Sequence, residues 1–251
     1  MAAHSLRLWL SAPLQSWGTS SRFDVRATDP VPSKSGVIGL ACAALGRPRG
    51  ESIDDLAALR FGVRIERPGT VVRDFQTAGA GTDPVAVASG ARSQARGAVS
   101  ERYYLADAAF VAAFEGDDEQ RDLLGEVAAV LAAPRWLLGL GRRSCPPVGP
   151  MVDAQSLVAG ELKEVLAEQW WPGRSDGEDS PGTSAEMKWR AEAGEDRGTG
   201  RVELRIEVRD GSASGGAEVH EVSDEPLGIA FEDRTFANRR VGICHVPREG
   251  E

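Results

Sequence analysis

The chain has 251 residues, of which 41% are hydrophobic and 27% charged, a composition typical of soluble globular proteins and not of disordered ones. No apolar run reaches the roughly 20 residues that cross a bilayer, and no basic stretch precedes the first apolar patch, so we expect neither a membrane partner nor a secretion signal. The three cysteines are far apart and form no CxxC pair. This spacing excludes a disulfide framework and a zinc finger, and favours the cytoplasm as the location.

The charge is distributed unevenly along the chain. Residues 1–110 contain 13 basic and 10 acidic side chains, whereas residues 111–251 contain 16 basic and 28 acidic ones, which together give the net charge of −9. A polyanionic partner is therefore expected to contact the first part. All but three of the 29 basic residues are arginines, which suits phosphate recognition but is also the mark of a GC-rich genome.

The first part alternates between strands and helices. A strand at His4–Leu10 is predicted from its alternating leucines, and a turn-rich loop follows it up to Gly18. Ser33 or Ser35 can cap a helix that Gly46 ends. The further predicted elements are, in chain order, a short helix at 51–60, strands at 61–66, 70–75, 102–106 and 109–115, and a helix at 117–131 that an Asp117–Gln120 capping box starts. This order predicts an α+β fold with helices on one side of an antiparallel sheet.

Two segments interrupt this pattern. Residues 77–100 have no aromatic side chain and cannot build a core, so they are expected to leave the body of the domain. Residues 174–200 are acidic and aperiodic, which predicts a mobile surface loop. Around the second segment we expect a helix at 156–169 and strands at 201–209 and 239–246, joined by a flexible link at 210–217. The predicted organisation is a domain at 1–150 and a smaller β-rich region at 151–251.

The sequence has no motif of a common enzyme class. It lacks the GxSxG of serine hydrolases, and its three histidines (His4, His220, His245) are dispersed, which argues against a metal site. The run Pro32–Ser35 lacks the glycines of a phosphate-binding loop that holds ATP. We therefore expect no catalytic residue, no metal and no cofactor.

Three segments could bind an anion more loosely. Lys34 and Ser35 lie at a helix N-terminus, where free N–H groups favour an anion, although capping and a solvated charge explain them equally. The loop Gly139–Ser144 combines glycines with Arg142 and Arg143, and its alternative is a tight turn. The acid-poor arm with Arg92 and Arg96 suits a phosphate backbone or is a plain linker. Trp17, Phe23, Tyr103 and Tyr104 could stack on bases or belong to the core.

A resemblance extends over most of the chain. Residues 6–46 (LRLWLSAPLQSWGTSSRFDVRATDPVPSKSGVIGLACAALG), 72–77 (VRDFQT), 104–110, 139–146 (GLGRRSCP) and 234–239 (RTFANR) resemble, in the same order, the Cas5 family of the RAMP superfamily. Within that family they are similar to the members found in the type I-E CRISPR surveillance complex, Cascade. The acidic segment 174–200 and the tail carry no resemblance.

The resemblance implies a ferredoxin-like domain, related to RNA-recognition modules, with a projecting β-hairpin thumb at about 77–102. It implies binding of the 5′ handle of CRISPR RNA for antiviral defence, without catalysis, and contacts with the CasC backbone subunit, which the chain would cap, and with the large CasA subunit. The residues expected to line the handle-binding surface and the thumb are Gln15, Trp17, Gly18, Arg22, Arg26, Lys34, Ser35, Arg92, Arg96, Arg102, Gly141, Arg142, Arg143 and Ser144.

Two other functions stay open. A related family member processes repeat RNA, so a metal-free endoribonuclease is the first alternative, and Tyr103, Tyr104, Lys34 and His245 are the residues that could serve it. The second is a protein-binding adaptor, which the acidic second part suggests.

Overall fold

The computed structural model describes residues 2–19, 25–79, 98–168, 201–208, 218–227 and 235–247. The expectations for Arg22, Phe23, Arg92 and Arg96 and for the acidic segment 174–200 lie outside these residues. Among the helices described, none is long and apolar enough to cross a membrane.

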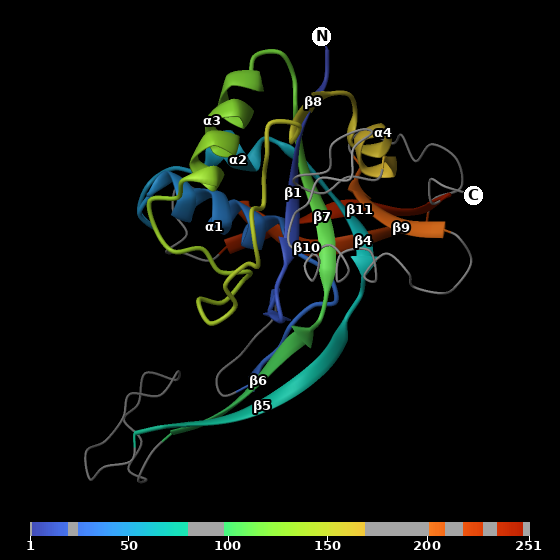
Figure 1. The fold of residues 1–251 in the computed structure, drawn as a ribbon. Helices are drawn as coiled ribbons and strands as arrows, with labels where there is room; N and C mark the ends of the chain where they lie inside the picture. Colours follow the sequence, from blue (N-terminus) through green and yellow to red (C-terminus); the bar gives the residue numbers. More distant parts are fainter. Residues whose placement is uncertain are drawn as a thin grey trace, which may run out of the picture.

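A seven-stranded antiparallel sheet forms the body of the molecule (Figure 1). Its strands are, in spatial order, β10 (Glu218–Leu227), β11 (Thr235–Pro247), β9 (Arg201–Glu207), β4 (Arg60–Arg67), β7 (Ala109–Gly116), β1 (His4–Ser11) and β8 (Leu157–Ala159). Strand β9 pairs with β4, and β8 pairs with β1. Strands from the two predicted regions, 1–150 and 151–251, therefore share one sheet.

Helices cover both faces of this sheet. Leu6, Leu8 and Leu10 of β1 point to the face covered by α1 (Lys34–Leu45) and α3 (Arg121–Ala132), and the short α2 (Asp54–Ala57) joins the same core. Trp9 lies on the other face, in a smaller core with α4 (Leu162–Ala167). Alternation along β1 is thus correct, but its polar-looking side is buried too, because α4 packs on that face of the sheet. The expected one-sided placement of helices holds for α1 and α3, whereas α4 lies opposite.

Local signals set the ends of α1. The Ser33 hydroxyl accepts a hydrogen bond from the backbone N–H of Gly36, so Ser33 and not Ser35 is the cap. Gly46 ends the helix with φ = 75°, a left-handed conformation that glycine adopts without steric cost. The expected capping box also forms: the Asp117 carboxylate accepts from the N–H of Gln120, and the Gln120 side-chain oxygen accepts from the N–H of Asp117. It lies in the turn before α3.

Three elements differ from the prediction. The expected helix at 156–169 is the short strand β8 followed by α4, because Gly160 has φ = 140° and interrupts any helix there. The expected helix at 51–60 is reduced to α2. Strand β10 was not predicted: it carries four acidic residues and a proline, a composition suited to the edge of a sheet but untypical of strands.

A second, smaller sheet projects from the body (Figure 1). Its central strand β6 (Ala98–Ala106) pairs along its whole length with β5 (Thr70–Ala78) and at its base with the two-residue strands β2 (Leu14–Gln15) and β3 (Val25–Arg26). The β5–β6 pair is a long antiparallel ribbon that extends away from the seven-stranded sheet. This arrangement places the predicted excursion between two strands that leave the body of the molecule.

Candidate nucleic-acid interface

The loop after β1 is held by a buried glutamine–tryptophan pair. The Gln15 amide donates to the carbonyl oxygens of Leu10 and Ala108, 3.2 and 2.8 Å away, and its oxygen accepts from the Trp17 indole N–H at 2.9 Å. Both side chains are almost fully buried. Trp17 lies against α1, where a Cβ at Gly36 would come within 3.0 Å of the ring. Gln15 and Trp17 therefore shape the loop from inside, and the core alternative is correct for Trp17.

The glycine-rich loop 139–145 packs directly on this first loop. The Ser16 N–H donates to the Leu140 carbonyl at 3.1 Å, and Leu140 and Cys145 are joined by a further backbone hydrogen bond. Gly141 has φ = 84°, and a Cβ there would lie 1.6 Å from the Ser16 carbonyl oxygen. Only glycine permits this close approach. Two segments about 125 residues apart, both proposed from the sequence as ligand-binding loops, thus form one unit.

Arg142 ties this unit to the base of the ribbon. Its guanidinium donates to the Tyr103 carbonyl at 3.2 Å and to the Arg26 carbonyl at 2.7 Å, and it lies 4.7 Å from the centre of the Tyr104 ring. These contacts join the 139–145 loop, β6 and β3. Arg142 is half-buried, and its planar guanidinium donates hydrogen bonds to carbonyl groups of the protein itself. Its role is therefore to position the loops.

The geometry at Arg142 predicts that lysine cannot replace it. Arg142→Lys keeps the charge but loses the fork of donors to Tyr103 and Arg26, and we expect the free energy of unfolding to fall by about 1–3 kcal/mol. Urea unfolding measures this. Arg143→Lys is the control, since Arg143 is exposed, and it should change the stability by less than about 0.5 kcal/mol. Equal stabilities of the two variants would contradict this role.

The side chains that remain available to a ligand lie around Arg142. Arg26 and Arg102 face each other across the β3–β6 pairing and are half-buried. We call Arg26, Arg102 and Arg143, which lie around Arg142, the arginine surface. Of the other expected residues, Gly18 and Ser144 are exposed beside it and Ser35 is half-buried at the start of α1.

Lys34 does not belong to this surface, and its expected contact with an outside anion is wrong in this structure. Its ammonium is fully buried and lies 3.0 Å from a Glu207 carboxylate oxygen and 3.1 Å from one of Glu225. Its backbone N–H donates to the Asp224 carboxylate at 2.7 Å. The helix N-terminus does hold an anion, as its free N–H groups favour, but Asp224 of β10 supplies it.

Asp224 is fixed by a second ion pair. Two nitrogens of the Arg239 guanidinium bind its two carboxylate oxygens, one at 2.9 Å, and both residues are buried. The network of Lys34, Glu207, Asp224, Glu225 and Arg239, which we call the buried ion network, therefore joins α1 to β9, β10 and β11. Sequence reasoning missed its acidic members, because nothing local distinguishes them from the many solvated carboxylates of the second part.

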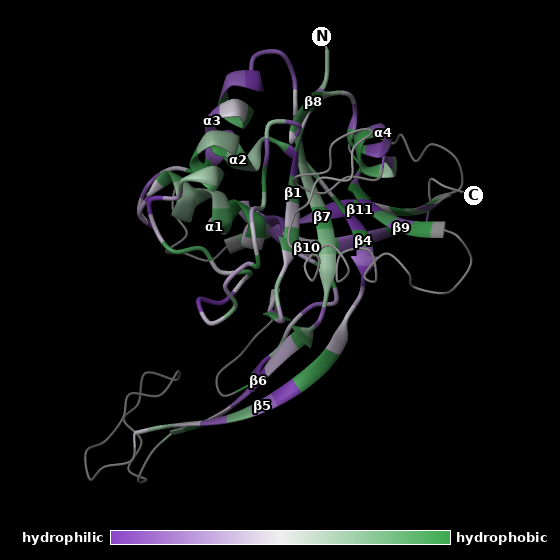
Figure 2. Ribbon diagram, viewed as in Figure 1, coloured by the Kyte–Doolittle hydropathy of each residue, from purple (hydrophilic) through white to green (hydrophobic). Residues whose placement is uncertain are grey.

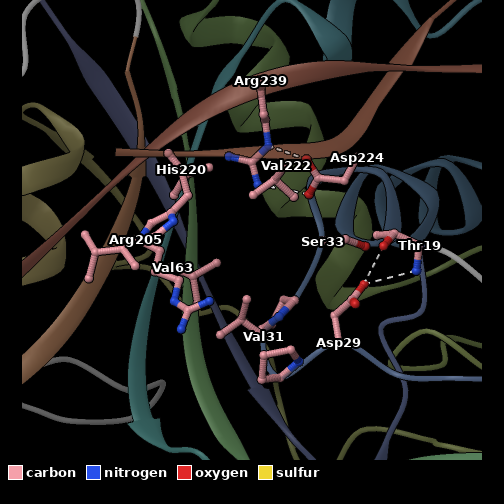
Figure 3. Close-up of a pocket in the computed structure, with 14 residues that line it drawn as sticks. Thr19, Asp29, Val31, Ser33, Val63, Arg205, His220, Val222, Asp224 and Arg239 are labelled. Atoms are coloured by element: carbon pink, nitrogen blue, oxygen red, sulfur yellow. Dashed lines mark hydrogen bonds and ion pairs between the residues drawn. The ribbon is translucent and has the colours of Figure 1, made fainter. Parts of the chain in front are cut away.

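A pocket of about 340 Å³ opens beside this network (Figure 3). Valines of β4, β10 and β11 (Val63, Val222, Val241) give it an apolar floor, and its polar rim includes His220 and Arg205. Asp29, also on the rim, accepts hydrogen bonds from the backbone and hydroxyl of Thr19 (Figure 3), and its own N–H donates to the Trp17 carbonyl at 3.1 Å. The pocket is thus directly connected to the first loop.

Three of the side chains considered for catalysis, Tyr104, Lys34 and His245, lie next to other side chains of the protein. Tyr104 is buried under Arg142, and His245 lies on β11 near Glu203, with a nitrogen–oxygen distance of 4.0 Å. The Lys34 ammonium is enclosed by its carboxylates. Burial raises the pKa of the Cys42 thiol to about 11 and also raises that of Cys145, so both stay neutral and behave as small apolar residues.

Comparisons with known proteins identify the family of the chain. The family model described as CRISPR-associated protein (Cas_Cas5) matches residues 5–241. The chain belongs to this Cas5 family. A curated relative, the CRISPR system Cascade subunit CasD of Escherichia coli (strain K12), is 32% identical over 155 residues, which cover 58% of this chain and 68% of the relative.

Two solved structures resemble this Cas5-family chain over nearly its whole length. One, described as a crystal structure of a Cas protein, has a TM-score of 0.65 and 33% identity and covers 98% of this chain and 96% of its own. The other, from a CRISPR RNA-guided surveillance complex, has a TM-score of 0.68 and 31% identity, with coverages of 97% and 90%. The mixed fold with one large antiparallel sheet and few helices is therefore that of known Cas proteins.

Proposed function

We propose that this Cas5-family protein is a non-catalytic RNA-binding subunit of a cytoplasmic CRISPR surveillance complex, and that the arginine surface holds the 5′ handle of the guide RNA. The observation that carries the proposal is the convergence of the 15–18 loop, the 139–145 loop and the base of the ribbon around Arg142. Arginine forks at such a place neutralise phosphates, and the exposed backbone at Gly18, Gly141 and Ser144 can approach a single strand closely.

The ribbon and the pocket support the same function. The β5–β6 ribbon leaves a body of sheet and helices, as a thumb on a ferredoxin-like domain would. Strand β5 starts before the expected boundary at 77, and β6 ends after the expected boundary at 102. A splayed base needs an apolar floor and a few polar groups at the rim, and the pocket of Figure 3 offers both. We also propose that the chain caps a CasC backbone subunit and contacts the large CasA subunit.

The test replaces three arginines of this surface and measures the retention of guide RNA. A variant with Arg26→Ala, Arg102→Ala and Arg143→Ala should retain guide RNA in the assembled complex about tenfold less well, because up to three phosphate contacts are lost. The slope of log affinity against log salt should fall by about one per contact. Arg240→Ala is the control, because Arg240 is exposed on β11, away from this surface. Unchanged retention and salt slope in the triple variant would refute the assignment.

Catalysis is tested in the same preparation. Repeat RNA incubated with the purified protein and EDTA should stay intact, since the Lys34 ammonium is enclosed by carboxylates and Tyr104 is buried. Specific cleavage that Tyr104→Phe abolishes would establish the nuclease instead.

A further inference from the structure

The pocket of Figure 3 has opposite hydrogen-bonding chemistry on two of its sides. Asp29, on the loop before α1, lies on one side, and Arg205 of β9 lies on another (Figure 3). Hydrophilic residues stand next to hydrophobic ones in β9 and β11 (Figure 2), so the same strands supply both polar groups and the apolar floor. The volume of about 340 Å³ falls within the range of about 300–1,000 Å³ that is typical of sites for small ligands.

Asp29 offers an acceptor to a ligand. Its Oδ2 accepts hydrogen bonds from the backbone N–H of Thr19 at 3.0 Å and from the Thr19 hydroxyl at 2.7 Å, and these two contacts fix the side chain. Its second oxygen has no hydrogen-bond partner among the residues that the structure describes. Because an ionised carboxylate only accepts hydrogen bonds, this side of the pocket favours a ligand edge that donates them.

Arg205 offers donors. Its Nε donates to the Glu203 carboxylate at 2.7 Å, which orients the guanidinium, and its two terminal nitrogens have no partner in the described part of the chain. A guanidinium only donates, and its fork matches two adjacent acceptors. Asp224 and Arg239 also line the pocket, but they are bound to each other. The hydrogen-bonding preference of the pocket therefore comes mainly from Asp29 and Arg205.

Guanine is the nucleobase whose edges match this pair. It carries two adjacent donor groups, N1–H and the 2-amino group, on one edge, and the adjacent acceptors O6 and N7 on another. Adenine, cytosine and uracil do not combine two adjacent donor groups with two adjacent acceptors. A base of single-stranded RNA can turn out of the strand and expose these edges to a protein.

We propose that this pocket binds a guanine base, with its N1–H and amino group on Asp29, its O6 and N7 on Arg205 and its ring on the valine floor. This rests on the proposed function and adds a base preference to it. Asp29 follows Arg26 of the arginine surface by three residues, and three residues of extended chain span at most about 11 Å. A strand held on that surface therefore reaches the pocket within a few nucleotides. A guanine of the guide and a free guanine nucleotide share this chemistry, and the experiment distinguishes them.

The experiment changes single atoms of the ligand and single side chains of the pocket. GMP, AMP, CMP and UMP are titrated into the purified full-length chain by calorimetry. Labelled RNAs with the repeat-derived 5′ end are measured by anisotropy, with each guanine replaced in turn by inosine, which lacks the amino group, or by 7-deazaguanine, which lacks the N7 acceptor. Asp29→Asn and Arg205→Gln each alter one side of the pocket. Arg240→Gln is the matched control, because Arg240 is exposed and alternates with Arg239 and Val241, which line the pocket.

GMP should bind at least about tenfold more tightly than the other three nucleotides, and each replacement at one position of the RNA should lower its affinity by about five- to tenfold. Asp29→Asn should abolish the preference for guanine over inosine, and Arg205→Gln the preference for guanine over 7-deazaguanine, both with an unchanged melting temperature. Arg240→Gln should keep both preferences.

The outcomes distinguish the source of the base from the existence of the site. GMP selectivity without any sensitive RNA position would identify the ligand as a free nucleotide. Equal binding of the four nucleotides together with no sensitive position overturns the proposal, as does a guanine preference that survives both pocket variants. If the triple arginine variant retains guide RNA normally, the proposed function fails, while the GMP titration still decides whether the pocket selects guanine.

Discussion

Lys34→Met is expected to lower the free energy of unfolding by about 3–5 kcal/mol, the usual cost of removing one partner from a buried ion pair. The methionine fills most of the space, but the carboxylates of Glu207 and Glu225 lose the ammonium that lies about 3 Å from each. Urea unfolding of the purified chain measures the loss. RNA retention per folded molecule and its salt slope should not change, since the ammonium is fully buried.

Two further variants test this result: one replaces an exposed lysine, and the other combines Lys34→Met with a substitution of its partner. Lys163→Met, on the exposed side of α4, should change the stability by less than about 0.5 kcal/mol. Lys34→Met with Glu207→Gln should be more stable than the sum of the two single losses predicts, because the residues interact directly. Additive losses, or a Lys34 variant as stable as wild type, would show that the buried ion network does not hold α1.

The second large effect is expected at Gly141. Gly141→Ala places a Cβ where the Ser16 carbonyl oxygen already lies and requires a left-handed backbone at alanine, so the two loops must separate. We expect a loss of about 2 kcal/mol or more in stability and of about tenfold in guide-RNA affinity, because Arg142 moves with its loop.

Gly125→Ala is the matched control for this substitution. Gly125 lies inside α3, and a Cβ there would have its nearest neighbour at an ordinary 3.9 Å. Alanine should stabilise that helix by about 0.5–1 kcal/mol. A Gly141 variant that behaves like the Gly125 variant would show that the close packing of the two loops does not matter.

Short-range signals predicted much of this fold. The alternating leucines of β1, the Ser33 cap and the Gly46 stop all act within a few residues, and the structure has each of them. The helix predicted at 156–169 failed because β8 exists only through its pairing with β1. Strand β10 was missed because its register comes from β11 and its composition from its place at the edge.

In the candidate site, too, features set by nearby residues were predicted from the sequence, whereas features set by distant residues were not. Glycines and arginines at 139–144 identified a loop with special backbone geometry, and the Gly141 conformation and the Arg142 contacts account for them. Lys34 was misassigned because the partners that bury it lie 173 and 191 residues later in the chain. In the sequence, a basic residue at the start of a helix looks the same whether its charge is solvated, paired with an RNA phosphate or paired with a distant carboxylate.

The distance from Lys34 to Glu207 has a consequence for how the polypeptide is made. At about 5–20 residues per second, a ribosome adds the 173 intervening residues in roughly 10–30 seconds, and Arg239 emerges later still. Until then the nascent helix start has neither its counter-ions nor the complete set of strands β9, β10 and β11. The amino-terminal half is therefore expected to complete its packing only after Glu207, Asp224 and Arg239 have been made, so a chain cut short before Arg239 should be as damaged as one with a defect in the core itself.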